Sequence, residues 1–144
     1  MAPPGTYRAR LLVDGVTKTE NIEVKIDPRV AADGVTQADL VEQTSFALKV
    51  RDLLSDARKV VQRLREARDN KRGDQAKVQE LWDKFVDKPG PYPANMLLNQ
   101  ISNISAEINR ADQRVGASAF ERYNEVMKEF TALKAEVDRV IPAQ

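Results

Sequence analysis

One seam of apolar residues at helical spacing constrains the fold of this chain more than any other feature. Its members lie three or four residues apart, or seven where one step is skipped: Leu40, Ala47, Val50, Leu54, Ala57, Val61 and Leu64. This spacing keeps them on one face of an α-helix. Thr36 and Asp39 precede the seam as a capping box, which satisfies the free amides at a helix start. The sequence therefore predicts a helix of about 32 residues ending near Arg68, roughly 48 Å long, which needs partners along its length.

Three further apolar stripes supply those partners. The short second stripe contains Val78, Leu81, Trp82 and Phe85; the third contains Leu97, Ile101, Ile104, Ile108 and Ala111; the fourth contains Tyr123, Val126, Phe130, Leu133, Val137 and Val140. Gly73 and the prolines at positions 89, 91 and 93 separate the stripes, because both residue types interrupt helices. Trp82 is expected in the core, and Ser118 is expected to cap the last helix. Residues 36–141 should form an antiparallel bundle of three long helices and one short one, in a mainly α fold.

The N-terminal residues alternate between apolar and polar side chains, as in a half-buried β-strand. The apolar positions are Tyr7, Ala9, Leu11 and Val13, then Ile22, Val24 and Ile26. Asp14-Gly15 lies between the two runs and is a hairpin turn signal. Residues 1–27 are therefore expected to form a β-hairpin, and residues 28–35 a linker to the bundle.

A two-stranded hairpin is marginal in water unless its apolar face is covered. Three covers are open: the bundle, a second copy of the chain, or further strands of a β-sandwich. The last is preferred, with residues 1–27 as the final two strands of the sandwich. The candidate partner contacts are Tyr7, Leu11, Val24 and Ile26 on the hairpin, and Tyr92, which stands between two prolines in a rigid loop.

The residue types that the chain lacks exclude most catalytic chemistry. It has no cysteine and no histidine, hence no thiolate nucleophile, no disulfide, no common zinc ligand and no side chain that ordinarily titrates near neutral pH. We therefore expect no catalytic residue, no cofactor, no metal and no enzyme activity. The net charge of +1 gives no general attraction to nucleic acid or to an anionic membrane. No apolar run is long enough to span a bilayer, and the first residues lack the regions of a signal peptide.

Two kinds of charge cluster allow a functional interpretation, and a solvated surface is preferred for both. Acid pairs such as Asp39 with Glu42, or Glu125 with Glu129, leave a carboxylate-dependent hydrolase open, but such pairs usually form the wet face of a helix. The stretch 58–72 is rich in Lys and Arg but has no aromatic residue to stack on bases. Salt bridges or solvation are therefore preferred there over nucleic-acid binding.

Several segments carry a family resemblance. They are Pro4-Gly5-Thr6-Tyr7-Arg8-Ala9-Arg10-Leu11-Leu12-Val13-Asp14-Gly15, Val24-Lys25-Ile26-Asp27-Pro28-Arg29, Ala47-Leu48-Lys49-Val50-Arg51-Asp52, Gly90-Pro91-Tyr92-Pro93, Ala111-Asp112-Gln113-Arg114-Val115-Gly116 and Glu121-Arg122-Tyr123. Together they resemble the C-terminal end of large secreted bacterial proteins with sortilin-like or BNR-repeat β-propellers, which are commonly labelled glycosyl hydrolases. In that family a propeller comes first, a sandwich-like domain follows and a helical region ends the chain.

The resemblance covers nearly the whole chain but only the tail of such a protein. Any hydrolase chemistry would reside in the propeller, whose Ser-x-Asp-x-Gly-x-x-Trp repeats are absent here, so no catalytic residue carries over. The resemblance implies a non-catalytic accessory module that docks, scaffolds or dimerises a propeller protein, in a secreted or periplasmic location. The alternative is a free-standing helical module for protein interaction or oligomerisation. In both cases the expected partner is a protein, and neither nucleic acid nor a membrane.

Overall fold

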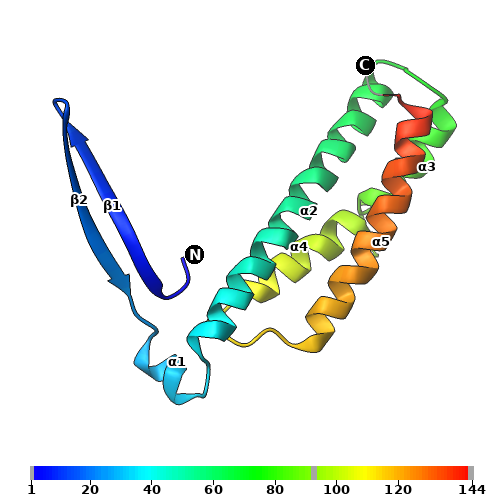
Figure 1. The fold of residues 1–144 in the computed structure, drawn as a ribbon. Coiled ribbons are helices and arrows are strands. Elements are labelled where there is room, and N and C mark those ends of the chain that lie inside the picture. Colours follow the sequence, from blue (N-terminus) through cyan, green and yellow to red (C-terminus); the bar gives the residue numbers. More distant parts are fainter. Residues whose placement is uncertain (1, 92–93, 143–144) are drawn as a thin grey trace. The chain divides into compact units, whose positions relative to one another are not determined.

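The computed structural model describes residues 2–91 and 94–142. Its elements, in chain order, are β1 (Gly5–Val13), β2 (Val16–Val24), α1 (Pro28–Ala32), α2 (Gln37–Asp69), α3 (Gln75–Phe85), α4 (Leu97–Ile108) and α5 (Ala117–Val140) (Figure 1). The prediction of a mainly α fold preceded by a β-hairpin is confirmed. The chain divides into two compact units. The first, here the hairpin unit, runs to Phe46 and includes Ala111–Val115, and the second, the helical unit, holds the other described residues.

The hairpin closes through a two-residue turn that the sequence specifies. Asp14 and Gly15 both have positive φ, 48° and 79°, as both central positions of a type I′ turn require. Glycine adopts this conformation freely, and aspartate does so more readily than most residues. The turn sets an antiparallel register in which Val13 lies opposite Val16, and the pairing continues to the far ends of both strands.

The hairpin differs from the expectation in burial and in its boundaries. Both strands are exposed along nearly their whole length rather than half-buried, because the sheet in the described residues has two strands and no third. β2 ends at Val24, so Ile26 lies beyond it. The segment expected as a linker contains α1, which starts at Pro28 because the fixed φ of proline suits the first helical position. Asp27 caps this helix by accepting a hydrogen bond from the Arg29 amide at 2.8 Å.

The start of α2 contains the capping box that the sequence predicts. The Asp39 carboxylate accepts a hydrogen bond from the Thr36 amide at 2.8 Å, and the Thr36 hydroxyl accepts one from the Asp39 amide at 3.2 Å. One turn later, the buried Gln43 side chain donates to the Ala111 carbonyl at 2.7 Å and accepts from the Gln113 amide at 3.3 Å. These bonds hold the segment that precedes α5 against the first turns of α2.

In the helical unit, α2 and α5 run in the same direction, while α3 and α4 run in the opposite one (Figure 1). An ion pair of 2.7 Å between Arg63 and Asp138 joins the C-terminal parts of α2 and α5. The third predicted helix ends at Ile108 rather than reaching Ala111, so α3 and α4 have nearly equal lengths of 11 and 12 residues. These two short helices together form the return path between the longer α2 and α5.

Two close approaches show that α3 and α5 run antiparallel. Just before α3, a Cβ on Gly73 would lie 3.0 Å from the Val140 carbonyl oxygen, at the end of α5. At the other end of α3, the Phe85 ring packs edge-on against Phe130, in the middle of α5, with 6.4 Å between ring centres. Gly73 also has φ of 74°, so a side chain there would meet both backbone strain and a close neighbour.

The core of the helical unit follows the predicted stripes, with a shift in α2. The fully buried large side chains are Phe85, Leu64, Leu97, Ile101, Val50, Val78, Val126 and Val137. In α2, Val60 is only 2% exposed and takes the core position expected for Val61, which is half-buried. Trp82 is half-buried rather than in the core, with the Arg68 guanidinium 4.4 Å from its ring centre. Gly116, not Ser118, is the N-cap residue of α5.

Candidate contact site on the hairpin

The hairpin register divides its side chains between two faces, because residues opposite each other in an antiparallel pair point to the same side. One set, the apolar face, contains Tyr7, Ala9, Leu11, Val13, Val16, Ile22 and Val24, together with Lys18 and Glu20. The other set, the polar face, contains Thr6, Arg8, Arg10, Leu12, Thr17, Thr19, Asn21 and Glu23. The alternation in β1 therefore predicts the composition of the apolar face correctly.

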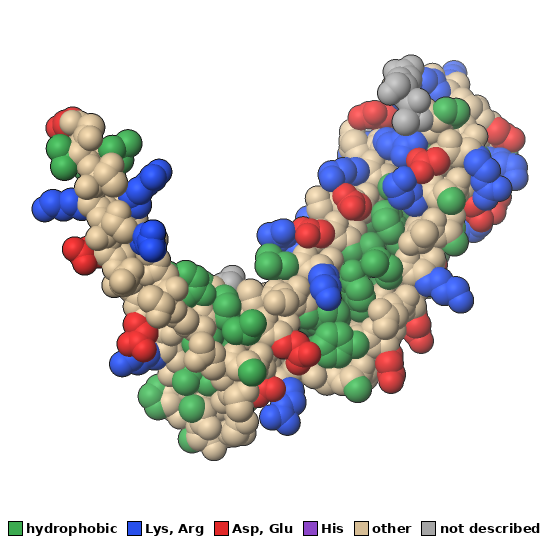
Figure 2. Space-filling view, in the orientation of Figure 1, with side chains coloured by type: hydrophobic (Ala, Val, Ile, Leu, Met, Phe, Trp, Pro, Cys, Tyr) green, Lys and Arg blue, Asp and Glu red, His purple; other side chains and the backbone are tan. Residues whose placement is uncertain are grey.

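Most of the apolar face is open to solvent. The exposed fraction is 63% for Leu11, 63% for Val16 and 50% for Ile22. Figure 2 shows hydrophobic side chains at the turn end of the hairpin, with Lys and Arg standing out along its length. An uncovered run of apolar side chains rimmed by polar ones is typical of a contact surface. The outer part of the apolar face is therefore the candidate site.

The base of the hairpin, by contrast, contacts the rest of its own unit. Val24 and Ile26 are half-buried and line a small hollow that is also formed by Ala2 to Pro4 and the first turns of α2. Next to it, the Gln37 side chain donates to the Pro4 carbonyl at 3.1 Å. Val24 and Ile26 thus contribute to the hairpin base, which makes them weaker candidates for a partner contact.

The other candidate contacts have different surroundings. Tyr7 is at the border of exposure, and its hydroxyl donates to the Pro3 carbonyl, whereas Leu11 lies on the open part of the apolar face. Tyr92 lies outside the described residues. The sequence analysis left out Val16, because the charged Lys18 and Glu20 interrupt the apolar alternation between Val16 and Ile22. The two-residue turn at Asp14-Gly15 is the signal that β2 begins at Val16.

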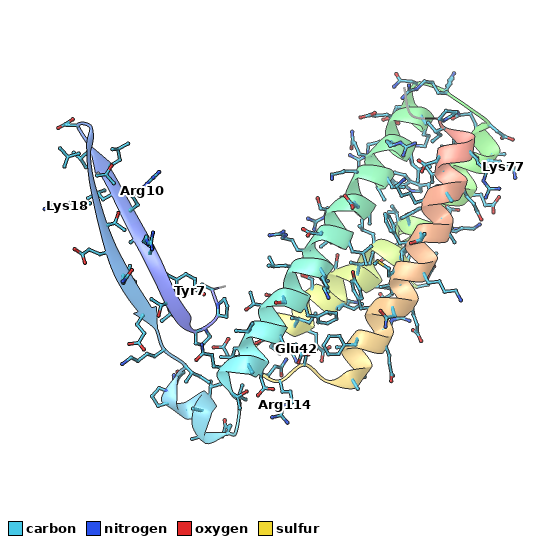
Figure 3. The ribbon with its side chains drawn as sticks, in the orientation of Figure 1. Tyr7, Arg10, Lys18, Glu42, Lys77 and Arg114 are labelled. Atoms are coloured by element: carbon cyan, nitrogen blue, oxygen red, sulfur yellow. The ribbon has the colours of Figure 1, made fainter. Side chains whose placement is uncertain are left out.

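Each strand of the hairpin has one edge that no described strand pairs with. The β1 edge carries two cations, Arg8 and Arg10, and no acid, whereas β2 carries Lys18, Glu20 and Glu23. Figure 3 shows Arg10 and Lys18 on the two neighbouring strands. Unpaired N–H and C=O groups at an edge pair readily with another strand, and charged side chains decide which strand can approach.

In the acid pair at the start of α2, Asp39 is held by one cation, Arg114, and by hydrogen bonds with Thr36. The Arg114 guanidinium lies 2.9 Å from the Asp39 carboxylate, and Figure 3 shows Arg114 and Glu42 at this end of α2. Arg114 lowers the pKa of Asp39 well below its usual range, and the Thr36 hydroxyl and amide lower it further. A general acid near neutral pH needs the opposite shift. In the second pair, Glu125 forms an exposed ion pair of 2.8 Å with Arg122.

The basic stretch 58–72 has several partners within the helical unit. Arg63 donates to the Asp138 carboxylate and to the Ile141 carbonyl, both at 2.7 Å. Lys59 pairs with Asp56 at 2.9 Å, and this acid raises the pKa of the lysine. Arg65 and Arg68 both lie over the Trp82 ring. These contacts agree with the expected salt-bridged face. The cation–π contacts involve Trp82, which lies on α3, so the sequence of the stretch 58–72 alone does not reveal them.

Across residues 2–91 and 94–142, no His, Cys, Asp or Glu cluster has the form of a metal site. No helix within the same residues is long and apolar enough to cross a membrane. Neither a protein-family model, nor a curated protein, nor a solved structure matches this chain. The open apolar face and the free strand edges of the hairpin are therefore the features on which a functional assignment depends.

Proposed function

We propose that the chain is a non-catalytic protein-contact module whose hairpin docks onto a partner protein through its apolar face. The observation that carries this proposal is the exposure of Leu11, Val13, Val16 and Ile22 on one side of a two-stranded ribbon. Covering about 100 Å² of apolar surface contributes about 2.5 kcal/mol. A partner that covers these side chains would therefore stabilise the hairpin and bind at the same time.

The partner that the family resemblance favours is the β-sandwich or propeller region of a secreted or periplasmic bacterial protein. Support comes from the position of the matching residues, because the segment Pro4 to Gly15 comprises β1 and the whole two-residue hairpin turn. Strands of a sandwich would continue the ribbon and place a second sheet on its apolar face. In this function the chain acts as an accessory that scaffolds or docks a propeller protein.

Two neighbouring leucines on opposite faces of the hairpin allow a matched test of the docking proposal. Leu11 is 63% exposed on the apolar face, and Leu12 is 64% exposed on the polar face. The purified chain would be mixed with the propeller and sandwich segment encoded nearest to it in the source genome, and binding measured by calorimetry. We expect Leu11→Glu to abolish binding and Leu12→Glu to leave it nearly unchanged. An absence of binding by the wild-type chain, or equal effects of the two substitutions, would refute the proposal.

The alternative function is a free-standing module for oligomerisation. One observation favours it, namely that the β2 edge carries a lysine and an acid two residues apart, Lys18 and Glu20. This arrangement allows a strand to pair with a copy of itself. The alternative does not require a propeller partner.

A further inference from the structure

The two edges of the hairpin differ in charge, and the β2 edge has the pattern required for pairing with itself. We infer that β2 takes β2 of a second copy as its antiparallel neighbour, which gives a two-fold dimer with one sheet running through both hairpins. The contact uses the main-chain edge of β2 rather than the apolar face. It therefore does not depend on the docking function proposed above.

The hairpin turn decides which main-chain groups of β2 are free. Val13 and Val16 flank the two-residue turn and hydrogen-bond to each other, so even-numbered β2 residues direct their N–H and C=O groups toward β1. The odd-numbered residues Thr17, Thr19 and Asn21 direct theirs to the open edge. An antiparallel neighbour must therefore align odd-numbered with odd-numbered residues. This condition excludes every second register and keeps both apolar faces on the same side of the sheet.

Among the remaining registers, one places opposite charges opposite each other. When Thr19 faces Thr19 of the second copy, Lys18 faces Glu20 of that copy, and Glu20 faces its Lys18. The same register places Val16 opposite Ile22. A shift by one allowed step places either Lys18 against Lys18 or Glu20 against Glu20, and like charges directly opposite each other are destabilising.

The β1 edge has the opposite property. Its outward-directed main-chain groups belong to even-numbered residues, among them Arg8 and Arg10. In the registers of greatest overlap, pairing β1 with β1 of a second copy places an arginine against an arginine. No acid on β1 compensates this repulsion. The charges thus select β2, and not β1, as the edge at which two copies meet.

A single introduced thiol tests the register, because the chain has no cysteine. Thr19 lies on the two-fold axis, where hydrogen-bonded partners have Cα atoms about 5.5 Å apart, within the range that a disulfide spans. We expect the full-length Thr19→Cys variant to become a covalent dimer under mild oxidation. Thr17→Cys is the matched control, since the two thiols would lie more than about 13 Å apart in this register. The control should cross-link roughly tenfold more slowly; equal rates would overturn the inference.

Charge reversal tests the two Lys18–Glu20 contacts without introducing a thiol. Sedimentation over a concentration series should show a dimer for the wild-type chain, and Lys18→Glu should weaken it roughly tenfold or more, because both attractive contacts become repulsive. The double variant Lys18→Glu with Glu20→Lys should restore dimerisation. Lys49→Glu is the control, since this exposed residue in α2 gives the same change in net charge.

The outcomes separate this dimer from the docking function. Leu11→Ala should weaken docking and leave the dimer in place, because Leu11 is on β1 and this substitution places no new charge opposite Lys18, its cross-strand neighbour. Far-UV circular dichroism confirms that each variant is folded. A wild-type chain that stays monomeric, or a double variant that fails to recover, would show that β2 is not the dimer edge.

Discussion

The Arg63 side chain joins two helices whose sequence positions lie far apart. Its guanidinium donates to the Asp138 carboxylate of α5 at 2.7 Å, across a separation of 75 residues, and its other terminal nitrogen donates to the Ile141 carbonyl at 2.7 Å. Both side chains are partly shielded from solvent. The contact therefore fixes α2 and α5 side by side, and it closes the C-terminal end of α5 with a charged donor.

Removing this contact should cost more than removing an ordinary surface charge. Arg63→Met keeps the aliphatic part of the side chain and loses the ion pair and the carbonyl hydrogen bond, which should lower the free energy of unfolding by about 1–2 kcal/mol. Arg58→Ala, on the exposed side of the same helix, should stay within about 0.5 kcal/mol. Urea melts measure both. Equal losses would mean that the Arg63 contact contributes nothing specific.

The shift of the α2 seam gives a test at two neighbouring valines. Val60→Ala should lower the free energy of unfolding by about 2 kcal/mol, because Val60 is 2% exposed and its truncation leaves a cavity. Val61→Ala removes the same atoms from a half-buried site, where the loss should be below about 1 kcal/mol. This order reverses the one that the seam alone predicts. A larger loss at Val61 in urea melts would support the original seam.

The lowered pKa of Asp39 predicts a contribution to stability that disappears in acid. Arg114 and Thr36 favour the charged form of Asp39, so the folded chain takes up this proton at lower pH than the unfolded chain, whose carboxyl has a pKa near 3.8. The contribution is fully present above that value and is lost as the pH falls through the lowered pKa of the folded state.

Asp39→Asn removes this titration. The difference in urea midpoint between the wild type and Asp39→Asn should be largest above about pH 5 and should shrink toward about pH 2. Glu125→Gln, which breaks an exposed ion pair on α5, is the control and should have a small effect throughout. A difference for Asp39→Asn that stays constant over the whole range would contradict the assignment.

A substitution in the hairpin turn should destabilise the two strands without affecting the helices. Gly15 has φ of 79°, so Gly15→Ala places a Cβ in a strained conformation and should destabilise the hairpin by about 1 kcal/mol. We expect amide exchange in β1 and β2 to be faster than in the long helices of the wild-type chain and to accelerate further in this variant, while the Leu64 and Ile104 amides should keep their rates. Gly90→Ala, at a site with open space and no positive φ, is the control. Hairpin amides as protected as that of Leu64 in the wild-type chain would refute this view.

Two local sequence signals predicted the start of α2 and the hairpin turn correctly, whereas the apolar pattern of the strands did not predict burial. The Thr36 and Asp39 pair and the Asp14-Gly15 turn each act within a few residues, and both have the expected geometry. Alternation in β1 and β2 correctly separated an apolar from a polar face. It did not indicate whether this chain covers the apolar face, because cover depends on residues that are remote in sequence or belong to another molecule.

The helical pattern has a similar limit. A period of 3.6 residues does not divide evenly into steps of three and four, so a seam extrapolated over many turns drifts around the helix. Between Ala57 and Leu64, steps of three and four fit Val60 and Val61 equally well, so the pattern alone does not decide that Val60 is the buried one. The partner of Trp82 was missed because Arg68 is on another helix, and a stretch inspected by itself shows no aromatic neighbour.

The unequal charges of the two strand edges also limit how far a sheet can grow. If two copies meet at β2, both outer edges of the resulting sheet are β1 strands, each carrying Arg8 and Arg10. Repulsion between arginines then opposes the addition of a third copy by the same kind of contact, so assembly stops at a closed pair instead of continuing as a filament. The two arginines would thus act as a terminator of polymerisation, a role that requires neither a pocket nor a catalytic group.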